Sequence, residues 1–289
     1  MADYARRPVT AAAFPDLFRL DGRVAMVTGG AGLLGRRYCE VLLQAGARVV
    51  IGDLDGERAE ALADELGSAC AFGLRQDVAD EASVGESIAR ATARFGRLDI
   101  LVNNAALTVR GGSERLSAAD YFAPFEQYRR DVWQRALDVN LTGMMLCSQA
   151  AGRQMLEQTP PGGVIVNISS TYGVVAPDQR LYEGVTSPYA EVAFNTPVSY
   201  AVTKTAVLGL TRYLATYWGR KNIRVNALTP HGVFDNHEER FVNNFVYRSP
   251  LGRMARNDEY RGALLFLVSD ASSYMTGANL IVDGGWTAW

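Results

Sequence analysis

Histidine, long hydrophobic runs and an excess of one charge are all scarce in this chain, and each scarcity excludes a class of protein. The formal net charge is −2, with no basic stripe, so neither a nucleic acid nor an anionic membrane is expected as a partner. No apolar run approaches the ~18 residues that a transmembrane helix needs. The 2 histidines show no metal-ligand spacing, so we expect no metal site, even from His231, His237 and Asp235.

Cysteine is also scarce. Both the spacing of the cysteines and the composition of the N-terminal residues indicate a reducing compartment. Cys39, Cys70 and Cys147 have no motif spacing and stand in apolar surroundings, which predicts reduced core residues. Residues 1–19 contain an arginine pair but no sustained apolar stretch, so we interpret them as a cytosolic extension rather than a signal peptide. A cytoplasmic location is therefore expected.

Strand-like and helix-like segments alternate along the rest of the chain. The expected strands are 23–29, 47–53, 69–78, 98–106, 162–170, 223–230 and 278–285. The expected helices are 33–45, 56–66, 81–95, most of 125–156, 199–219 and 258–269. Such alternation predicts an α/β fold, a doubly wound parallel sheet of about seven strands with helices on both faces. With 48% hydrophobic residues and no linker or repeat, residues 20–289 are expected to form one domain.

The stretch TGGAGLLG, residues 28–35, follows the first expected strand and opens the first expected helix. Glycine lets a backbone approach a pyrophosphate, and a helix N-terminus offers free N–H groups. We therefore predict a Rossmann-type dinucleotide site, although the spacing does not fit G-x-G-x-x-G from the first glycine. Its expected contacts are Gly29, Gly32, Leu34 and Gly35. The alternative is a plain turn between a strand and a helix.

An acidic residue at the end of the second strand favours NAD over NADP. Asp53 can accept hydrogen bonds from both adenosine ribose hydroxyls and would repel a 2′-phosphate, and Leu54 follows where a phosphate site would carry Arg or Lys. Arg36 and Arg37 lie near the loop, so NADP stays open. Residues at the ends of two later strands are also expected beside the cofactor, because ligands of parallel sheets bind there. They are Asp77, Val78, Asn104 and Ala105.

Tyr200 and Lys204 stand four residues apart on one expected helix and therefore share a face. A lysine ammonium one turn away favours the phenolate, so we expect it to lower the pKa of Tyr200 from ~10 toward the operating pH. Ser169 and Ser170 end a central strand, and Asn140 lies in the long helix. Without these additional residues, an exposed helical pair would be the better interpretation.

Eight segments in a fixed order resemble the short-chain dehydrogenase/reductase family, in its small single-domain branch. They are TGGAGLLG, DV at 77–78, NNAA, VNLTG, NISS, YAVTK, RVNALTP and VDGG. The resemblance implies that hydride passes between a nicotinamide and a carbinol carbon while Tyr200 acts as general acid/base. It implies that Ser170, which precedes Gly173 by three as the family serine does, binds the substrate oxygen.

The same resemblance implies supporting roles. Lys204 would hold the nicotinamide ribose together with Tyr200, and Asn140 would position a water that links Lys204 to solvent. Pro230 and Val233 would meet the nicotinamide, mainly through their backbone. A homodimer or homotetramer is also implied, with the helices 125–156 and 199–219 and the C-terminal WTAW as candidate surfaces.

The chain departs from the family pattern in three places. Position 33, usually glycine, is Leu33, and the resulting G-x-x-G-x-x-G spacing resembles the larger sugar-nucleotide-modifying branch. The chain lacks the extra length of that branch, so we keep the small-branch assignment and expect a slightly altered pyrophosphate turn. The family glycine after Pro230 is His231, and a frequent family threonine is Asp235.

The separation of Ser170 and Tyr200 is 30 positions, well beyond the short spacing usual in the family. We expect the added segment, about 174–198, to be a substrate wall or lid, with a decorative surface loop as the alternative. The irregular stretch 107–124 is expected to form the opposite wall, with Arg110 and Arg115 available for an anionic group. Candidate substrate contacts are Ser170, Tyr172, Arg180, Tyr182 and His231.

Three functions remain open from the residues alone. The first is an NAD(P)-dependent oxidoreductase of a secondary alcohol or ketone, on a polyhydroxylated sugar-like or cyclitol-like substrate. The segments PDQRLYEG and GVFDN also resemble family members from bacterial surface-sugar and flagellin-glycan pathways. The second is an epimerase or dehydratase that uses bound NAD transiently, and the third is a non-catalytic NAD-binding sensor.

Overall fold

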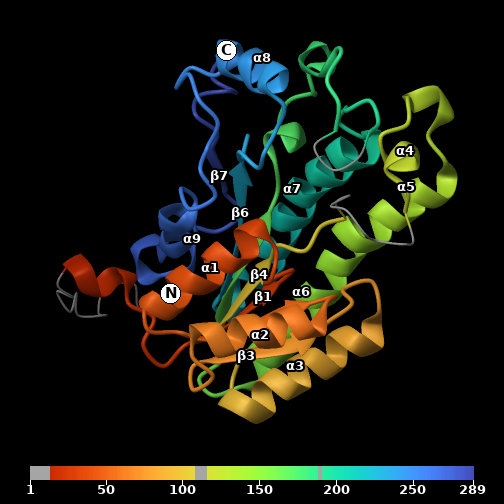
Figure 1. Ribbon diagram of the computed structural model, residues 1–289. Helices are drawn as coiled ribbons and strands as arrows, with labels where there is room; N and C mark the ends of the chain where they lie inside the picture. Colours follow the sequence, from red (N-terminus) through yellow and green to blue (C-terminus); the bar gives the residue numbers. More distant parts are fainter. Residues whose placement is uncertain (1–13, 108–115, 188–190) are drawn as a thin grey trace.

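A seven-stranded parallel sheet forms the centre of the computed structural model, which describes residues 14–107, 116–187 and 191–289 (Figure 1). The strand order is β3-β2-β1-β4-β5-β6-β7, and every neighbouring pair is parallel. The strands are β1 Val24–Thr28, β2 Arg48–Asp53, β3 Ala71–Arg75, β4 Ile100–Asn103, β5 Gly163–Ile168, β6 Ile223–Pro230 and β7 Asn279–Val282. The predicted fold class is confirmed. Arg110 and Arg115 lie outside the described residues.

Helices cover both faces of the sheet, which explains why its central strands are nearly continuous apolar runs. α1 Leu33–Gln44, α2 Gly56–Leu66 and α9 Arg261–Val268 pack against one face. α3 Glu81–Phe95, α6 Gly143–Glu157 and α7 Val198–Trp218 pack against the other. The remaining α-helices are α4 Ala118–Tyr121, α5 Arg130–Leu137 and α8 Glu239–Arg248. Short 3₁₀ turns are η1 Phe14–Phe18, η2 Phe125–Gln127, η4 Thr171–Gly173, η5 Gln179–Tyr182, η6 Gly219–Lys221 and η7 Asp270–Ser272.

The order of the strands reverses between β1 and β4, and this reversal positions the site. Crossovers leave β1 on one side toward β2 and leave β4 on the other toward β5. In sheets of this kind, ligands bind at the carboxyl ends of the strands beside such a reversal. The glycine loop after β1 and the NNAA segment after β4 meet there, since the Asn104 side chain bonds both Thr28 O and Gly29 O at 3.0 Å.

The long helix predicted over 125–156 is interrupted. It begins at Arg130 after the turn η2, and a π-helical segment, η3 Asp138–Thr142, separates α5 from α6. π-Helical turns inside helices frequently lie at functional sites. Here the wider turn contains Asn140, whose side chain bonds two other segments of the chain.

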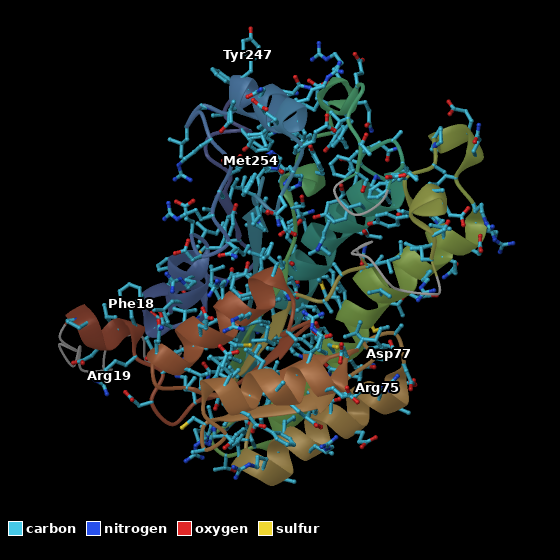
Figure 2. All side chains as sticks on the ribbon, in the orientation of Figure 1. Phe18, Arg19, Arg75, Asp77, Tyr247 and Met254 are labelled. Carbon is cyan, nitrogen blue, oxygen red and sulfur yellow. The ribbon has the colours of Figure 1, made fainter. Side chains whose placement is uncertain are left out.

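The helix α8 was not predicted. It packs on the added segment through a cluster that contains Leu181 and Tyr182 from the segment and Phe241 and Phe245 from α8. Figure 1 shows α8 next to the C-terminus, and buried Trp286 completes the cluster. Tyr247 projects outward from α8 (Figure 2) and is 94% exposed.

Three sequence expectations about individual side chains and segments can be compared with the structure. Cys39 and Cys147 are buried free thiols, but Cys70 is exposed in the turn before β3, so its placement in the core was wrong. Trp286 is core and Trp289 is exposed. No helix among the described residues is both long and apolar enough to cross a membrane.

Candidate active site

Tyr200 and Lys204 lie one turn apart near the start of α7, as predicted. Pro197 precedes the helix, where its fixed φ suits a helix start. Lys204 is buried, and its Nζ donates a hydrogen bond of 2.8 Å to the Ile168 carbonyl at the end of β5. The same Nζ lies 5.7 Å from the centre of the Tyr200 ring. The pair is therefore held against the carboxyl end of the sheet rather than exposed on a surface.

The two serines after β5 have different partners. The Ser169 hydroxyl donates to the Lys204 carbonyl at 2.8 Å and so joins the strand to α7. The Ser170 hydroxyl instead lies close enough to the Tyr200 phenol to lower the pKa of that group. Ser170, preferred from the sequence, is thus the serine that the fold brings to the phenol.

Burial controls the ionisation of this pair. Burial raises the pKa of Tyr200, and the interaction with Ser170 lowers it by a smaller amount. The expectation of a lowered Tyr200 pKa is therefore wrong, because desolvation outweighs the favourable interactions of the phenolate. Burial also lowers the pKa of Lys204 to about 8, so the ammonium form still dominates at pH 7.

Asn140 occupies the π-helical turn and is buried. Its side-chain oxygen accepts from the Leu107 N–H at 2.7 Å, and its side-chain nitrogen donates to the Thr203 hydroxyl at 3.1 Å. Thr203 precedes Lys204, so Asn140 connects the segment after β4 to the catalytic turn of α7. The Asn140 side chain is thus committed to the protein.

The glycine loop has the shape that a pyrophosphate requires. Gly29 has φ of +60°, and a Cβ there would lie 2.9 Å from Ala105 Cα. A Cβ on Gly35 would lie 2.2 Å from Gly29 O, so α1 packs tightly on the loop. Gly32 occupies the N-cap of α1 without a side-chain cap, and the first hydrogen bond of the helix runs from Arg36 N–H to Gly32 O at 3.0 Å. The amides of Leu33, Leu34 and Gly35, the first three residues of α1, remain for an anion.

Thr28 and Asn104 anchor this loop to β4. The Thr28 hydroxyl accepts from the N–H groups of Asn104 and Ala105, both at 3.0 Å. The Asn104 side-chain nitrogen donates to Thr28 O and Gly29 O. Asn104 therefore acts on the cofactor side through the loop that it holds. Sequence reasoning missed Thr28, although its place directly before Gly29 was a usable signal.

Asp53 lies at the end of β2 beside the loop. Its carboxylate accepts from the Ala31 N–H at 3.0 Å and from the Asp55 N–H at 3.2 Å. Burial raises its pKa, and these two hydrogen bonds oppose the shift. Leu54 is 58% exposed, with its side chain free to cover a base. Arg58, also missed from the sequence, donates to Ala31 O at 3.0 Å and so flanks the same residue as Asp53.

Arg36 and Arg37, the two arginines that left NADP binding possible, form ion pairs with glutamates. Arg36 bonds Glu40 at 3.1 Å and pairs with both oxygens of Glu65. Arg37 donates to both oxygens of Glu40 at 2.9 Å and to Asn257 at 3.2 Å. Neither guanidinium is free for a 2′-phosphate in this arrangement.

The other predicted cofactor contacts lie at neighbouring strand ends. Val78 and Ala105 line one narrow crevice with Thr28 and Gly143. Asp77 follows β3 in a turn, where its carboxylate accepts from the Ala79 N–H at 3.0 Å. Pro230 ends β6, and Val233 bridges to Ala255 just beyond it. All of them stand at the carboxyl edge of the sheet, so a dinucleotide lying across β1 and β4 fits the residues present.

The candidate substrate contacts divide into two groups. Tyr172 and Tyr182 are buried beside the catalytic pair, and their hydroxyls bond each other at 2.9 Å. Arg180 instead has a side chain that is 81% exposed and pairs with Asp178 at 2.7 Å. Asp178 also binds Arg248 of α8 at 2.6 Å, which fastens the added segment to α8. Arg180 is therefore a surface partner of Asp178, and its side chain does not lie with Tyr172 and Tyr182.

His231 lies in an aromatic box after β6. Its Nδ1 contacts the Thr171 hydroxyl, and its ring lies 4.4 Å from Trp286 and 5.0 Å from Phe245. Burial lowers its pKa to about 4, so the ring is neutral near pH 7. Nε2 is buried without a hydrogen-bond partner among the described residues. His231 thus packs against Tyr172, and the centres of the two rings are 5.6 Å apart.

No group of three or more His, Cys, Asp or Glu side chains in the described part of the chain could hold a metal ion. A cavity of about 430 Å³ lies between the added segment and residues 123–125. Its lining is mostly proline and small apolar side chains, with Gln179, Asn195 and Thr196 as polar members. Thr196, which sequence reasoning also missed, bonds Tyr182 at 2.6 Å.

Known proteins resemble this chain over nearly its whole length. A family model described as Enoyl-(Acyl carrier protein) reductase matches residues 30–287. The D-threitol dehydrogenase of Mycolicibacterium smegmatis is 37% identical over 280 residues, which cover 93% of this chain and 95% of that protein. The trans-4-hydroxycyclohexanecarboxylate dehydrogenase of Sinomonas cyclohexanicum is 36% identical over 278 residues, with 93% and 95% covered.

A solved structure agrees with these relatives. The gluconate 5-dehydrogenase of Burkholderia cenocepacia J2315, in complex with NADP and tartrate, superposes with a TM-score of 0.79 at 34% identity, covering 95% of this chain and 99% of that chain. The residues that the family model matches include most of the glycine loop, the catalytic turn of α7 and the last strand. The chain therefore belongs to the short-chain dehydrogenase/reductase family and is an NAD(P)-dependent oxidoreductase.

Proposed function

We propose that the protein is an NAD-preferring dehydrogenase/reductase of a secondary alcohol or ketone in a polyhydroxylated, sugar-like or cyclitol-like molecule. The observation that carries this proposal is the meeting of Ser170, Tyr200 and Lys204 beside a glycine loop at the carboxyl edge of the sheet. This arrangement can move a proton at a substrate oxygen next to a bound dinucleotide.

Tyr200 is the proton-transfer group in our proposal. In oxidation it accepts the carbinol proton, and in reduction it donates a proton to the ketone oxygen. Ser170, which interacts with the Tyr200 phenol, holds that oxygen through its hydroxyl. The nicotinamide, when bound, supplies or accepts the hydride.

Lys204 and Asn140 support the proton transfer. The Ile168 carbonyl fixes the Lys204 ammonium 5.7 Å from the centre of the Tyr200 ring, where it can hold the nicotinamide ribose. Asn140 holds the adjacent turn through Thr203, and its backbone carbonyl is proposed to bind the water that links Lys204 to solvent. Because burial raises the pKa of Tyr200, oxidation should accelerate as the pH rises above neutrality.

NAD is the proposed cofactor on the strength of Asp53. Its carboxylate would accept from the ribose hydroxyls and repel a 2′-phosphate, and Arg36 and Arg37 are already paired with acids. The proposed contacts along the cofactor are Gly29, Gly32, Leu34, Gly35, Asp53, Leu54, Asp77, Val78, Asn104, Ala105, Tyr200, Lys204, Pro230 and Val233.

The substrate class is supported by two kinds of observation. The hydroxyls of Tyr182 and Thr196, from the added segment, join that of Tyr172 in the turn after Ser170, which suits a molecule with several oxygens. The related enzymes are named for threitol, hydroxycyclohexanecarboxylate and gluconate, all of which carry hydroxyl groups.

The proposal is tested by substituting Tyr200→Phe, which removes only the phenolic oxygen. We expect kcat for a secondary alcohol such as D-threitol to fall by about 10³-fold or more, with NADH binding retained within a few-fold. Tyr274→Phe is the matched control, since Tyr274 is fully exposed. Near-normal turnover in Tyr200→Phe would contradict the proposed role.

We also propose a homodimer or homotetramer formed through α6 and α7. Exposed apolar side chains gather on these helices, including Met145, Val202, Tyr213 and Tyr217. The rings of Tyr213 and Tyr217 stack at 5.9 Å, which presents a flat aromatic surface. Light scattering should show an oligomer for the wild type and a smaller species for Tyr213→Glu. A monomeric wild type would contradict the proposed assembly.

A cytoplasmic location is proposed from the three cysteines, all of which are free thiols. Cell fractionation tests it, and recovery of the protein outside the cytoplasm would contradict it.

A further inference from the structure

Three hydroxyls from the added segment and the turn after Ser170 form a chain of hydrogen bonds. Thr196 Oγ1 donates to the Tyr182 hydroxyl at 2.6 Å, and the hydroxyls of Tyr182 and Tyr172 lie 2.9 Å apart. All three residues are buried. Each hydroxyl in such a chain has one proton to donate and two lone pairs that accept.

Thr196 gives its only proton to Tyr182, so Tyr182 keeps its own proton and can donate it to Tyr172. Either hydroxyl of the two tyrosines can be the donor, and with Tyr182 as donor the Tyr172 proton is left over for a further partner. Within residues 14–107, 116–187 and 191–289 the Tyr172 hydroxyl is hydrogen-bonded to Tyr182 alone. Each donated bond polarises the next O–H, so Tyr172 ends the chain as a strengthened donor. A buried donor without an acceptor is costly, and a ligand oxygen would remove that cost.

The position of Tyr172 relates this donor to the reacting oxygen. Tyr172 lies in the turn η4, and its N–H donates to the Ser170 hydroxyl oxygen at 3.2 Å. The Tyr200 phenol lies near enough to act electrostatically on both Tyr172 and Tyr182. Tyr172 therefore lies two residues after Ser170 in the same short turn, near the Tyr200 phenol.

Aromatic packing holds the donor in place. The Tyr182 ring lies 5.2 Å from Phe194 and stacks on Phe241 of α8 at 5.4 Å. The Tyr172 ring meets the edge of His231 at 5.6 Å. Polar groups held in this way discriminate between ligands, since they cannot turn away from a partner that lacks the matching oxygen.

We infer that Tyr172 is a specificity-determining residue that donates a hydrogen bond to a second substrate oxygen, on a carbon near the reacting carbinol. Tyr182 and Thr196 are positioning residues that act through Tyr172. The substrate class is accordingly a diol, or a hydroxyketone in the reverse direction. This inference rests on the proposed function. In it Tyr200 transfers the proton at the reacting oxygen, and Tyr172 binds a second oxygen of the substrate.

The test compares two alcohols that differ by one oxygen, trans-cyclohexane-1,2-diol and cyclohexanol, with NAD⁺ as the second substrate. For Tyr172→Phe, we expect the fall in kcat/KM on the diol to exceed the fall on cyclohexanol by about 10-fold or more. Thr196→Val should produce a smaller difference in the same direction, because it weakens the donor without removing it. Tyr274→Phe, an exposed tyrosine, is the matched control.

Unfolding midpoints and NADH affinity are measured for every variant. If Tyr172→Phe does not fold, the ratio for Thr196→Val decides. Equal losses on both alcohols, or no loss on either, would overturn the inference while leaving the proposed function standing. A wild-type protein that binds NADH but oxidises neither cyclohexanol, the diol nor D-threitol would overturn the proposed function and the inference with it.

Discussion

Replacing Asp53 with asparagine tests how this site chooses between NAD and NADP. The substitution removes one charge and leaves the side chain almost the same size. Asp53 now accepts from the Ala31 and Asp55 N–H groups, and Arg58 donates to Ala31 O at 3.0 Å. Without the carboxylate, Arg58 would be the dominant charge beside the position of a 2′-phosphate.

The size of the effect follows from Coulomb's law. A carboxylate and a phosphate dianion about 5 Å apart repel by roughly 2 kcal/mol at the dielectric constant of water, and by more in less polar surroundings. Relief of that repulsion corresponds to about 30-fold tighter NADPH binding. Asparagine keeps one acceptor oxygen, so NADH should bind only about 5-fold more weakly through the lost ribose hydrogen bond. The NADPH-to-NADH preference should therefore change by about 100-fold.

Fluorescence titration of both reduced cofactors measures this ratio directly, at two salt concentrations because the repulsion is screened. Glu57→Gln is the matched control, since it removes one acidic charge from the exposed first turn of α2. A change in the ratio below about 3-fold in Asp53→Asn, or an equal change in Glu57→Gln, would refute the reasoning.

Further predictions concern the loop and the aromatic box. Thr28→Val removes the acceptor of two backbone N–H groups and should lower the free energy of unfolding by about 2–4 kcal/mol in denaturant titrations, whereas a loss below ~0.5 would contradict its anchoring role. Gly35→Ala should weaken NADH binding at least ~10-fold through its clash with Gly29 O, while Gly209→Ala, with nothing within 4 Å, should not. The folded-state pKa of His231 is lowered to about 4, so the unfolded chain binds a proton first, and stability should fall from pH 6.5 toward 4. His231→Gln should flatten that decline, and an unchanged pH dependence would contradict a neutral buried His231.

Most helices and strands could be predicted because their signals are local. The helices expected at 56–66 and 81–95 have those bounds in the structure. Each is capped by an acid directly before it, since Asp55 accepts from the Arg58 N–H and Asp80 from the Ala82 N–H. Such caps are set by the neighbouring sequence and do not depend on the rest of the fold.

The helix α8 could not be predicted with the same ease, because its partners are distant in sequence. Phe241 and Phe245 are four apart, which was a usable signal, but they find their packing partners in Leu181 and Tyr182. The π-helical turn at Asn140 has the same origin. Its side chain bonds Leu107 and Thr203, which come from two other parts of the chain.

The catalytic residues could be predicted from their spacing in the sequence. The roles of individual residues in the added segment could not. Tyr200, Lys204 and Ser170 could be brought together from the sequence because a helix and a strand end place them. Nothing in the sequence distinguished Arg180, which points to solvent, from Tyr182, which is buried two residues later. That distinction depends on Asp178 binding Arg248 of α8.

The unusual glycine spacing also has a physical account. Gly29 needs its positive φ, and Gly35 has no room for a Cβ. Gly32 serves as the N-cap, so Leu33 becomes the first residue of α1 and stays half-buried. Glycine at 33 is therefore not required by this turn.

The central claim is that hydride moves between the substrate carbon and the nicotinamide, with net oxidation of the alcohol. The most direct measurement uses D-threitol carrying deuterium at its secondary carbons with NAD⁺, followed by NMR of the cofactor. We expect NADH that carries deuterium at C4, formed in equal amount to the ketone product. Epimerised or dehydrated product without net NADH, or NADH that contains no deuterium, would contradict it.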